Sequence, residues 1–524
     1  MKNINADYIT RLFSVVLFAF LTIFGAFFFV YLVIYAHSLY SYLLAFSYLI
    51  LMLISGFFNI FTAYAYYRSY FYYKYLDGIK RKISYSADKK SVQNKPSVAI
   101  VMSTFNEDTS VVKRNLQRLL KLNYPKEKLA FYLLDDSTEP TIITEMRSFC
   151  GKLGIKYIHR QKRRAYKAGA LNNMLKYSKE DLIAYFDYDE YLVNLNFVQD
   201  LVPYFADKKL TYIQTEKSYA KGNFFSDTVA LIDGFFFKFV QPARALDNTA
   251  IFAGSCGIIR RKHLVAMKGF PEYITEDSFF SFETDMNGYK SLYLPKVYAL
   301  GKPITTFTEL VRQQWRYNYG GTQFISYFAE RLRHRNKERK VSRLSIVDYA
   351  MHGFGLNYIS VIAIIFTIFS ILVTFSQLPI VSVSISQLFQ PSLINLDLEI
   401  FGMGVLFASV LMPMMLTKIY FGSFKKGIMF FFLTFALVFV RAKAAAAAVF
   451  KTSRKIVWDK DSINGNYGKF VYAFRNSLAE SSFSLILMLL GAMAMVIGNL
   501  FGGFWLLWYA ALYLMTPLMF YKYG

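Results

Sequence analysis

Long apolar runs stand at both ends of the chain, and short runs of alternating character lie between them. The first two long runs, 9–36 and 40–67, each exceed the roughly 20 residues that a helix needs to cross the hydrocarbon core of a membrane. Residues 37–39 between them carry no Lys or Arg, whereas residues 68–95 are rich in both. The positive-inside rule therefore predicts two antiparallel spanning helices within 1–67, with the amino terminus and the following segment in the cytoplasm.

The carboxyl-terminal part, 346–524, is expected to be a second membrane domain. It contains four apolar runs whose lengths suit spanning helices: 346–375, 400–420, 483–500 and 504–519. The loop 376–399 carries no Lys or Arg, so we expect it outside the cell. In all, about six crossings are predicted, in a multi-pass protein of the cell membrane with both termini in the cytoplasm.

One apolar run, 427–440, is too short for a full crossing and has basic residues on both sides. A helix that lies in the membrane interface or re-enters the membrane fits better, and we assign 427–450 to it. Two further segments, 224–239 and 307–333, mix aromatic residues with Arg, Lys and Gln, which is typical of helices at a membrane surface. Amphipathic packing on a sheet explains the first equally well, and the second is assigned to an interfacial region, 304–345.

Short β-rich runs alternate with helical stretches from residue 97 to about 303, within a domain that we assign to 68–303. This alternation predicts a cytoplasmic α/β domain with a mainly parallel sheet, inserted between the two membrane parts. Strands are expected at 97–102, 129–134, 156–158, 182–186 and 212–214. Polar residues follow three of these strands, at 103–107, 135–136 and 187–189, and open α/β sheets bind ligands at the carboxyl ends of their strands.

The composition indicates two environments. Of 524 residues, 55% are hydrophobic and 19% aromatic, more than a soluble domain contains. A net charge of +25 could indicate nucleic acid as a partner, but the long apolar runs favour an anionic lipid surface and an anionic small substrate. We therefore expect membrane lipids, and no nucleic acid, among the partners. The two cysteines, Cys150 and Cys256, give no support to a disulfide framework.

The sequence Asp-Tyr-Asp at 187–189 places two carboxylates directly after an apolar strand. Oxygen ligands suit Mg²⁺ or Mn²⁺, and the diphosphate of a substrate would supply further oxygens. Because such pairs are common in surface loops, the context has to support this role. Two acidic residues at 135–136 end an earlier strand, and Lys167 stands near the start of a helix, where a phosphate can bind. The basic pair at 163–164 fits a solvated turn as well as it fits substrate contact.

A second acidic motif, Thr-Glu-Asp, lies at 275–277. A reaction in which an acceptor hydroxyl attacks a donor carbon needs a base to take the hydroxyl proton. Asp277 is the candidate for this base, with Glu276 beside it. The alternative is that Asp277 caps the helix that begins at Ser278.

The last motif, 313–317, combines a cation, amide groups and flat aromatic faces at helical spacing. Arg316 could stabilise a diphosphate as it leaves, and an aromatic ring could stack on a sugar face. The alternative is an interfacial helix that uses Trp, Tyr and Arg as membrane anchors. The position of the motif after the acidic motifs favours a catalytic role.

Taken in order, these motifs resemble those of the processive, membrane-embedded family 2 glycosyltransferases: Thr-Phe-Asn-Glu, Asp-Asp, Lys-Ala-Gly-Ala-Leu-Asn, Asp-Tyr-Asp, Thr-Glu-Asp and Gln-Gln-Trp-Arg-Tyr. That family includes hyaluronan, chitin and cellulose synthases, and the membrane layout is most similar to that of hyaluronan synthase. The resemblance covers 97–317. It implies a GT-A fold, a nucleotide-sugar donor and a polysaccharide acceptor.

The resemblance also implies a role for each motif residue. Nucleotide and donor contacts are implied for Thr104, Asn106, Glu107, Asp135, Asp136, Lys167, Asp187, Gln313 and Gln314. A Mg²⁺ or Mn²⁺ ion on the donor diphosphate is implied for Asp189 with Asp187. Catalysis is implied for Asp277 as base, with Glu276 and Arg316. Acceptor contacts are implied for Thr275, Trp315, Tyr317 and Trp458.

Two positions depart from the family pattern. The family motif Gln-X-X-Arg-Trp ends here in Tyr317, which keeps a stacking surface and leaves the acceptor preference open. The gating segment Trp-Gly-Thr-Arg is matched only by Trp-Asp-Lys-Asp at 458–461. The role of Trp458 rests on that partial match alone.

The leading hypothesis is an inverting, metal-dependent transferase that moves a sugar, expected to be UDP-linked, onto a growing polysaccharide and passes the polymer through its own helices. One alternative is a non-processive enzyme of the same fold that glycosylates a lipid, such as polyprenyl phosphate or a diacyl lipid; the motif at 313–317 argues against it. Another is a transporter whose cytoplasmic domain senses nucleotide-sugar, for which a separate base would be superfluous. The sequence leaves the oligomeric state open.

Overall fold

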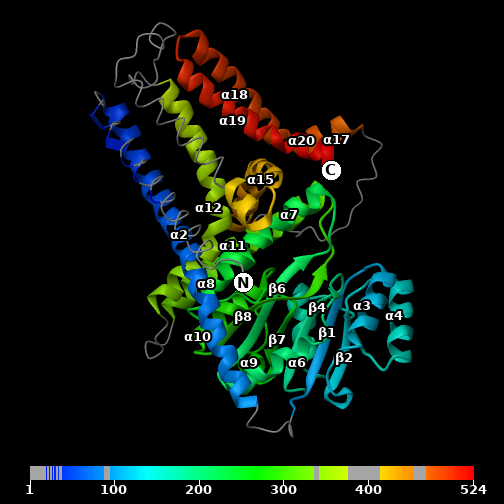
Figure 1. Ribbon diagram of the computed structural model, residues 1–524. Coiled ribbons are helices and arrows are strands. Elements are labelled where there is room, and N and C mark those ends of the chain that lie inside the picture. The colour runs from blue at the N-terminus through cyan, green and yellow to red at the C-terminus, as the bar shows by residue number, and fades with distance from the viewer. Residues whose placement is uncertain are drawn as a thin grey trace.

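The structure is a computed structural model that describes residues 38–87, 95–334, 342–375, 414–451 and 468–524, with single positions between 19 and 34. Figure 1 shows a sheet-based domain at one end of the molecule and a group of long helices at the other. Some predicted features lie outside the described residues: most of the first apolar run 9–36, the loop 376–399, most of the run 400–420, and Trp458.

The domain is built on one eight-stranded sheet, in the order β3-β2-β1-β4-β7-β6-β8-β5. The strands are β1 (Val98–Thr104), β2 (Leu129–Asp135), β3 (Lys156–His159), β4 (Leu182–Asp187), β5 (Tyr191–Leu192), β6 (Leu210–Tyr219), β7 (Gly257–Arg260) and β8 (Lys290–Gly301). Strand β1 is parallel to β2 and β4, with Thr104 opposite Asp135 and Ser103 opposite Asp187. This register brings the predicted polar motifs to one edge of the sheet.

All five predicted strands are present, but the sheet is mixed and only one half of it is parallel throughout. Strand β7 is antiparallel to both β4 and β6, and β5 is antiparallel to β8, whereas β6 and β8 are parallel. Strand β8 was not predicted, because Pro295 interrupts its apolar pattern. At that point the pairing with β6 skips from Leu294 to Val297. The GT-A-like α/β domain is confirmed, with a mixed sheet.

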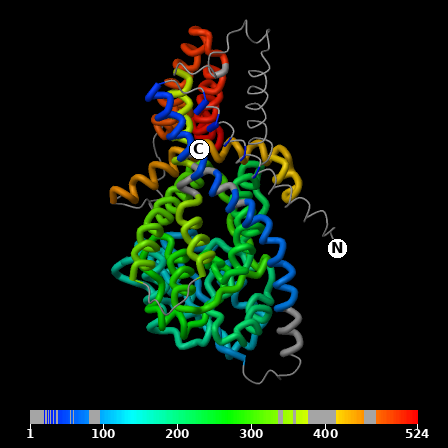
Figure 2. The backbone as a smooth tube through the Cα atoms, turned by 90° about the vertical axis from the view of Figure 1, so that its left-hand side faces the viewer, coloured from blue at the N-terminus to red at the C-terminus, as the bar shows by residue number. Residues whose placement is uncertain are grey.

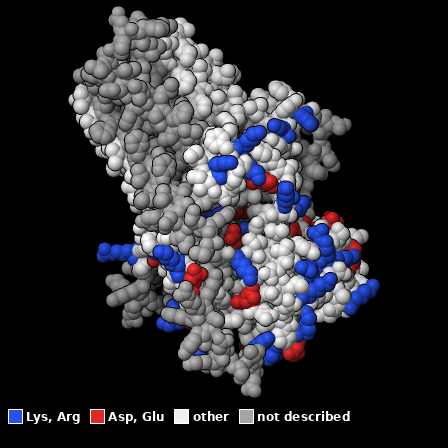
Figure 3. Space-filling model, viewed as in Figure 1, with Lys and Arg blue, Asp and Glu red and all other residues white. Residues whose placement is uncertain are grey.

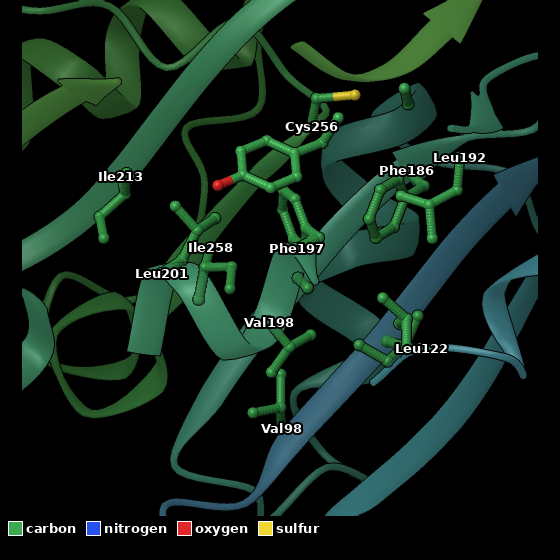
Figure 4. Close-up of a cluster of buried hydrophobic side chains, with 14 of the residues drawn as sticks. Val98, Leu122, Phe186, Leu192, Phe197, Val198, Leu201, Ile213, Cys256 and Ile258 are labelled. Carbon is green, nitrogen blue, oxygen red and sulfur yellow. The ribbon is translucent and has the colours of Figure 1, made fainter. Parts of the chain in front are cut away.

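Helices cover both faces of the sheet. They are α3 (Thr109–Leu119), α4 (Pro140–Lys152), α5 (Tyr166–Met174), α6 (Phe197–Leu201), α9 (Arg261–Ala266) and α10 (Glu276–Met286). Val98, Ile100 and Met102 of β1 pack with α3, α4 and α6, in the core that Figure 4 shows in part. Ala99 and Val101 face the opposite core, with α5, α9 and α10. A strand buried on both faces needs a continuous apolar run, which makes β1 recognisable from its sequence.

Three helices lie between the sheet and the membrane part: α7 (Phe224–Phe235), α8 (Gln241–Ala245) and α11 (Phe307–Arg333). A π-helical turn, Phe236–Val240, joins the first two. The remaining helices are α2 (Leu39–Ala87), α12 (Arg343–Thr374), a helix at 414–421, α15 (Phe424–Ala436), α16 (Val438–Val449), α17 (Lys469–Asn476), α18 (Leu478–Val496), α19 (Leu500–Tyr513) and α20 (Met515–Tyr523).

Three helical stretches among the described residues are long and apolar enough to cross a membrane: Phe424–Val449, Leu478–Val496 and Gly502–Tyr523. The two halves of α12, Arg343–Gly355 and Ser360–Thr374, meet at 64° and add a fourth span if they act as one. The chain is thus a membrane protein, and the count of six crossings remains a prediction. Figure 2 shows α15 and α16 running across the direction of α12, α18 and α19. That orientation agrees with the interfacial or re-entrant assignment of 427–450, which also remains a prediction, as do the domain boundaries.

Polar and apolar contacts join the sheet domain to the membrane helices. Arg68 of α2 forms an ion pair with Asp247, and the His352 ring of α12 lies 2.9 Å from the hydroxyl of Ser278 in α10. Helix α10 also shares an apolar core with α11 and α12, formed by Phe279, Phe282, Met286, Phe324, Phe328 and Tyr349. The domain and the helices therefore pack against each other as parts of one structure.

Candidate active site

The edge of the sheet where β1, β2 and β4 end carries most of the predicted site residues. In Figure 3, acidic and basic side chains gather around a hollow between the sheet domain and the helices above it. Loops after the strands, the first turns of α5 and α10, and helix α11 contribute the side chains described below.

Asn106 holds the loop after β1 against the loop after β2. Its backbone is left-handed (φ 49°), and its N–H donates to the Ser137 hydroxyl (2.8 Å). The Asn106 amide oxygen accepts from the N–H of Thr138 (2.8 Å), and the amide nitrogen donates to the Thr138 hydroxyl (2.9 Å). Asn tolerates this backbone conformation better than most residues. Thr104, at the end of β1, is buried beneath this loop pair.

The two aspartates after β2 have different partners. Asp135 is fully buried and accepts hydrogen bonds from the Tyr157 hydroxyl (2.6 Å) and the Ser137 N–H (2.9 Å). Asp136 forms a two-point ion pair with Arg160, and the two side chains are only 8% and 11% exposed. Asp135 therefore shapes the loop, whereas Asp136 fixes the basic segment that precedes α5.

The two arginines of that basic segment have different surroundings. The Arg163 guanidinium lies 3.6 Å from the centroid of the Phe105 ring and 3.9 Å from the Asp136 carboxylate. The Arg164 side chain is 87% exposed, which agrees with the alternative of a solvated turn. Its carbonyl oxygen, however, lies 2.0 Å from the place of a Cβ on Gly169, so only glycine fits at that position of α5.

Lys167, in the first turn of α5, points at the end of β4. Its ammonium donates to Asp187 Oδ1 (2.5 Å) and to the carbonyl oxygen of Gly254 (2.9 Å). Lys217 of β6 lies 3.7 Å from the other carboxylate oxygen of Asp187. Burial acts to raise the pKa of Asp187, but the two ammonium groups outweigh it and hold the pKa at about 2. Asp187 is therefore negatively charged at neutral pH.

Asp189 has the opposite environment. Burial and the negative charges of Asp187 and Glu190 raise the pKa of Asp189 to about 7, and it forms no ion pair with any residue that the structure describes. A carboxylate that has no paired cation among the described residues, such as that of Asp189, is a suitable ligand for a hard divalent cation. The described residues include no group of three His, Cys, Asp or Glu side chains that could hold the ion alone. Asp187 and Asp189 would therefore share it with the oxygens of a bound diphosphate. Between them, Tyr188 hydrogen-bonds Glu107.

The second acidic motif begins α10, with Thr275 at the N-cap position, so Asp277 is not the cap. Asp277 Oδ1 accepts from the N–H of Ser278 (2.8 Å), and Oδ2 would lie 3.4 Å from a Cβ built on Gly254. Burial raises the pKa of Asp277, and burial together with the charge of Asp277 raises the pKa of Glu276 to about 8. A carboxylate with a raised pKa is a stronger base near neutral pH.

Helix α11 carries Arg316 and Tyr317 to the same region. Burial lowers the pKa of the Arg316 guanidinium, and the charge of Asp187 opposes that change, which puts the two groups within electrostatic reach of each other. Tyr317 is 39% exposed, and the charges of Lys217 and Asp277 act on its hydroxyl. The cation and one aromatic group of the last motif are therefore close enough to the carboxylates to be influenced by their charge.

The two glutamines of this motif face different neighbours. Gln313 lines a small pocket with Tyr219. Gln314 is fully buried, and its side-chain oxygen accepts two hydrogen bonds from Arg441 of α16 (2.9 and 3.0 Å). Trp315 is half-buried. The structure therefore places Gln314 in the packing between α11 and α16, and its predicted donor contact is untested.

Lys167 and Asp277 both approach Gly254, and Lys167 joins Asp187 to the carbonyl oxygen of this glycine. Three charged residues of the site were missed by the sequence analysis: Arg160, Glu190 and Lys217. Nothing in the local sequence of Arg160 or Lys217 indicates the carboxylates that they meet in space. Glu190 directly follows the Asp-Tyr-Asp motif, and that adjacency was a usable signal.

Comparison with known proteins decides the nature of the domain. Residues 99–266 match the family described as Glycosyl transferase family 2. They form a family 2 glycosyltransferase domain. The predicted enzyme class is thereby confirmed, and so is the resemblance to processive family 2 synthases. The closer similarity in layout to hyaluronan synthase remains a prediction.

The glycosyltransferase domain is similar to UDP-forming catalytic subunits of cellulose synthase. It is 31% identical over 238 residues to the subunit of Pseudomonas fluorescens strain SBW25, and 30% identical over 236 residues to that of Xanthomonas axonopodis pv. citri strain 306. Each match covers 44% of this chain and 32% of the relative, so this chain matches about a third of the length of these relatives. A solved mannosyltransferase, PcManGT from Pyrobaculum calidifontis in complex with GDP-Man and Mn²⁺, is 15% identical, with a TM-score of 0.45 and coverage of 74% of this chain and 99% of that one.

Proposed function

We propose that this chain transfers a sugar from a UDP-linked donor to the growing end of a polysaccharide, with inversion at the anomeric carbon, and passes the polymer through its own membrane helices. The observation that carries the proposal is the approach of Lys167 and Asp277 to Gly254, with Asp187 bound to Lys167. A cation, a metal-type carboxylate and a separate base serve a donor diphosphate and an acceptor hydroxyl at one place. The words "UDP-forming" in the names of the similar cellulose synthase subunits support UDP as the nucleotide.

The nucleotide would lie across the paired loops after β1 and β2. The stack of Arg163 on Phe105 offers a flat, cationic surface to a base. The loop residues Thr104, Asn106 and Glu107, with Asp135 and Asp136, form the polar frame around that surface. Because Asp136 is already fixed by Arg160, this frame is ordered before a donor binds.

The diphosphate would extend from this frame toward β4. A Mg²⁺ or Mn²⁺ ion, when held by Asp187 and Asp189, would neutralise charge on the diphosphate and make it a better leaving group. Lys167 and Arg316 would orient the phosphates and stabilise the negative charge that develops on the departing oxygen. Gln313 would add a donor contact from the same face of α11.

Asp277 would remove the proton from the acceptor hydroxyl. In one displacement, the acceptor oxygen forms a bond to the anomeric carbon, the bond from that carbon to the diphosphate oxygen breaks, and the hydroxyl proton passes to Asp277 Oδ2. The electron pair of the broken bond leaves with the nucleoside diphosphate. A single displacement inverts the anomeric configuration, and one base is sufficient for it. Glu276 lies beside Asp277; with its pKa raised to about 8 it would be mainly protonated at neutral pH and would leave the negative charge on Asp277.

The acceptor would approach along α11. A Cβ on Gly320 would lie 2.5 Å from the Thr275 hydroxyl oxygen, so the base motif and this helix are in close contact. Trp315 and Tyr317 would supply flat surfaces for sugar rings. Helix α11 packs on α16 through the pair of Gln314 and Arg441, and membrane helices thus lie next to the acceptor side of the site. Trp458 is kept as a predicted acceptor contact.

The experiment is a nucleotide-release assay on the full chain in lipid nanodiscs, with Mn²⁺ or Mg²⁺ and a panel of UDP- and GDP-sugars. Asp277→Asn should lower turnover at least about 100-fold and leave UDP binding within about twofold, since the base acts only on the acceptor. Glu272→Gln is the matched control, because it removes an exposed carboxylate from the segment that leads into α10. Turnover of Asp277→Asn at the wild-type rate would overturn the assignment.

The size of the product separates the hypotheses that the sequence left open. A polymer that elutes ahead of the protein after detergent extraction, and that a glycoside hydrolase shortens, supports the polysaccharide reading. A single-sugar lipid product would replace it with the lipid-acceptor enzyme. Donor binding without any turnover, even with added lipid and oligosaccharide acceptors, would favour a sensor.

A further inference from the structure

Lys217 is a half-buried cation that the mechanism above does not use. It lies on β6, its side chain is 20% exposed, and its ammonium stands 3.7 Å from Asp187 Oδ2 and 3.6 Å from Glu190 Oε1. Lys167 holds the other oxygen of Asp187 from α5. Both oxygens of the first carboxylate of the Asp-Tyr-Asp motif are therefore occupied by lysine.

Glu190 keeps Lys217 in this position. One oxygen of its carboxylate accepts from the Ser255 hydroxyl (2.7 Å) and the other from the N–H of Asp187 (3.0 Å). Glu190 is only 6% exposed, so it offers Lys217 a fixed and desolvated counter-charge. Lys217 can thus leave Asp187 without losing its second partner.

A divalent cation that arrives alone meets an unfavourable site. To reach Asp187 it has to displace an ammonium, and two like charges that approach to ion-pair distance repel each other strongly where water is partly excluded. The described residues contain no group of three His, Cys, Asp or Glu side chains that could hold the cation without a further ligand. A nucleoside diphosphate removes both obstacles. Its oxygens complete the coordination shell of the cation, and its negative charge provides a new partner for the displaced lysines.

We propose that Lys217 is a positioning residue that makes divalent-cation binding conditional on the nucleoside diphosphate: it neutralises Asp187 in the empty enzyme and turns to the diphosphate and Glu190 when donor and cation enter together. This inference rests on the proposed function. It concerns the order of binding, and leaves the identity of the transferred sugar open.

The test measures Mn²⁺ binding directly, by loss of the free-ion electron paramagnetic resonance signal, on the full chain in nanodiscs with and without UDP. Wild-type protein should bind Mn²⁺ at least about tenfold more tightly when UDP is present, after subtraction of the Mn²⁺–UDP complex formed in buffer. Lys217→Met should bind Mn²⁺ without UDP at least about tenfold more tightly than wild type, because one competing charge at ion-pair distance is gone.

Two variants control the result. Lys217→Arg keeps the charge and should restore wild-type behaviour. Lys221→Met removes the same charge from an exposed position a few residues along the chain and should leave Mn²⁺ affinity unchanged. The wild-type comparison with and without UDP stands by itself if Lys217→Met does not fold.

The proposal is overturned if wild-type protein binds Mn²⁺ equally well with and without UDP, or if Lys217→Met does not change the affinity for Mn²⁺ alone. Either result leaves the proposed transferase intact. No uptake of Mn²⁺ under any condition, in contrast, would remove the metal from the proposed function together with this role of Lys217.

Discussion

Lys167 and Asp277 both face the α-carbon of Gly254: a methyl group there would lie 3.5 Å from the lysine ammonium and 3.4 Å from the carboxylate oxygen Oδ2. The residue that would hold the donor and the residue that would deprotonate the acceptor therefore both lie beside the Gly254 α-carbon, which carries no side chain. The space in front of it is where the two substrates would have to meet.

Gly254→Ala tests this arrangement. The methyl group would enter the space between Lys167 and Asp277, and we expect kcat/KM to fall at least about tenfold, which is ~1.4 kcal/mol of transition-state free energy. The left-handed backbone (φ +78°) adds strain of roughly 1–2 kcal/mol to any substitution. Gly154→Ala is the matched control, since its φ is +67° and nothing lies within 4 Å of the added methyl. Equal loss of activity in both variants would contradict the prediction.

The pH dependence of transfer should report Asp277. Burial raises its pKa above the ordinary value near 4, while Ser278 N–H, Lys167 and Lys217 act to lower it. Because the base must be deprotonated, kcat/KM should fall as pH decreases through this raised pKa and be constant above it. At saturating Mn²⁺, Lys217→Met should move the acid limb to higher pH, since one charge that stabilises the carboxylate is lost. If the acid limb of kcat/KM does not move in Lys217→Met, a group other than Asp277 is responsible for it.

Arg160→Met should weaken donor binding. Among the described residues, the substitution leaves the buried Asp136 with Arg163, at 3.9 Å, as its one ion-pair partner, and the loop proposed to frame the nucleotide loses its anchor. We expect the dissociation constant of UDP, measured by calorimetry, to rise at least about tenfold, or ~1.4 kcal/mol. Arg164→Met changes an exposed neighbour and should alter it less than about twofold. Similar effects of the two substitutions would contradict the distinction drawn between these arginines.

Gln314→Leu and Gln313→Leu should have different consequences although the residues are adjacent. Gln314→Leu removes the acceptor of two hydrogen bonds from the buried Arg441, and should lower the free energy of unfolding by about 1–3 kcal/mol. Its thermal midpoint, followed by fluorescence-detected size-exclusion chromatography, should therefore decrease. Gln313→Leu should leave that midpoint unchanged and raise KM for the donor. If instead Gln314→Leu raised KM for the donor and left the thermal midpoint unchanged, the result would support a donor contact of Gln314.

The strands that carry chemistry were predictable because their surroundings impose a simple pattern. Buried parallel strands need continuous apolar runs, so β1, β2 and β4 could be located, and with them the residues that follow at 103–107, 135–136 and 187–189. In the mixed half of the sheet, only β6 was located from the sequence. Strand β8 contains a proline, and its pairing depends on a partner eighty or so residues earlier in the chain.

Contacts between charged side chains were the second feature that could not be predicted from the sequence. A lysine in a strand is most often solvated, and only the three-dimensional arrangement reveals that Lys217 faces Asp187 and Glu190. The same holds for Gln314, because residues of one helical motif point in several directions and sequence spacing does not show which direction meets a neighbouring helix. The motifs therefore did not reveal the contact between Gln314 and Arg441, and they did not include Arg160 and Lys217.

The hydrogen-bond contact between Ser278 and His352 ties the start of α10 to a helix of the membrane part. Ser278 directly follows the proposed base, and its partner belongs to α12, a helix that continues into the membrane part. A soluble piece that ended at residue 303 would lose this contact and would expose Phe279 and Phe282 to water. Helix α12 thus supports the turn that carries the proposed base, and we expect solubilising agents that disturb this helix to lower the rate of transfer.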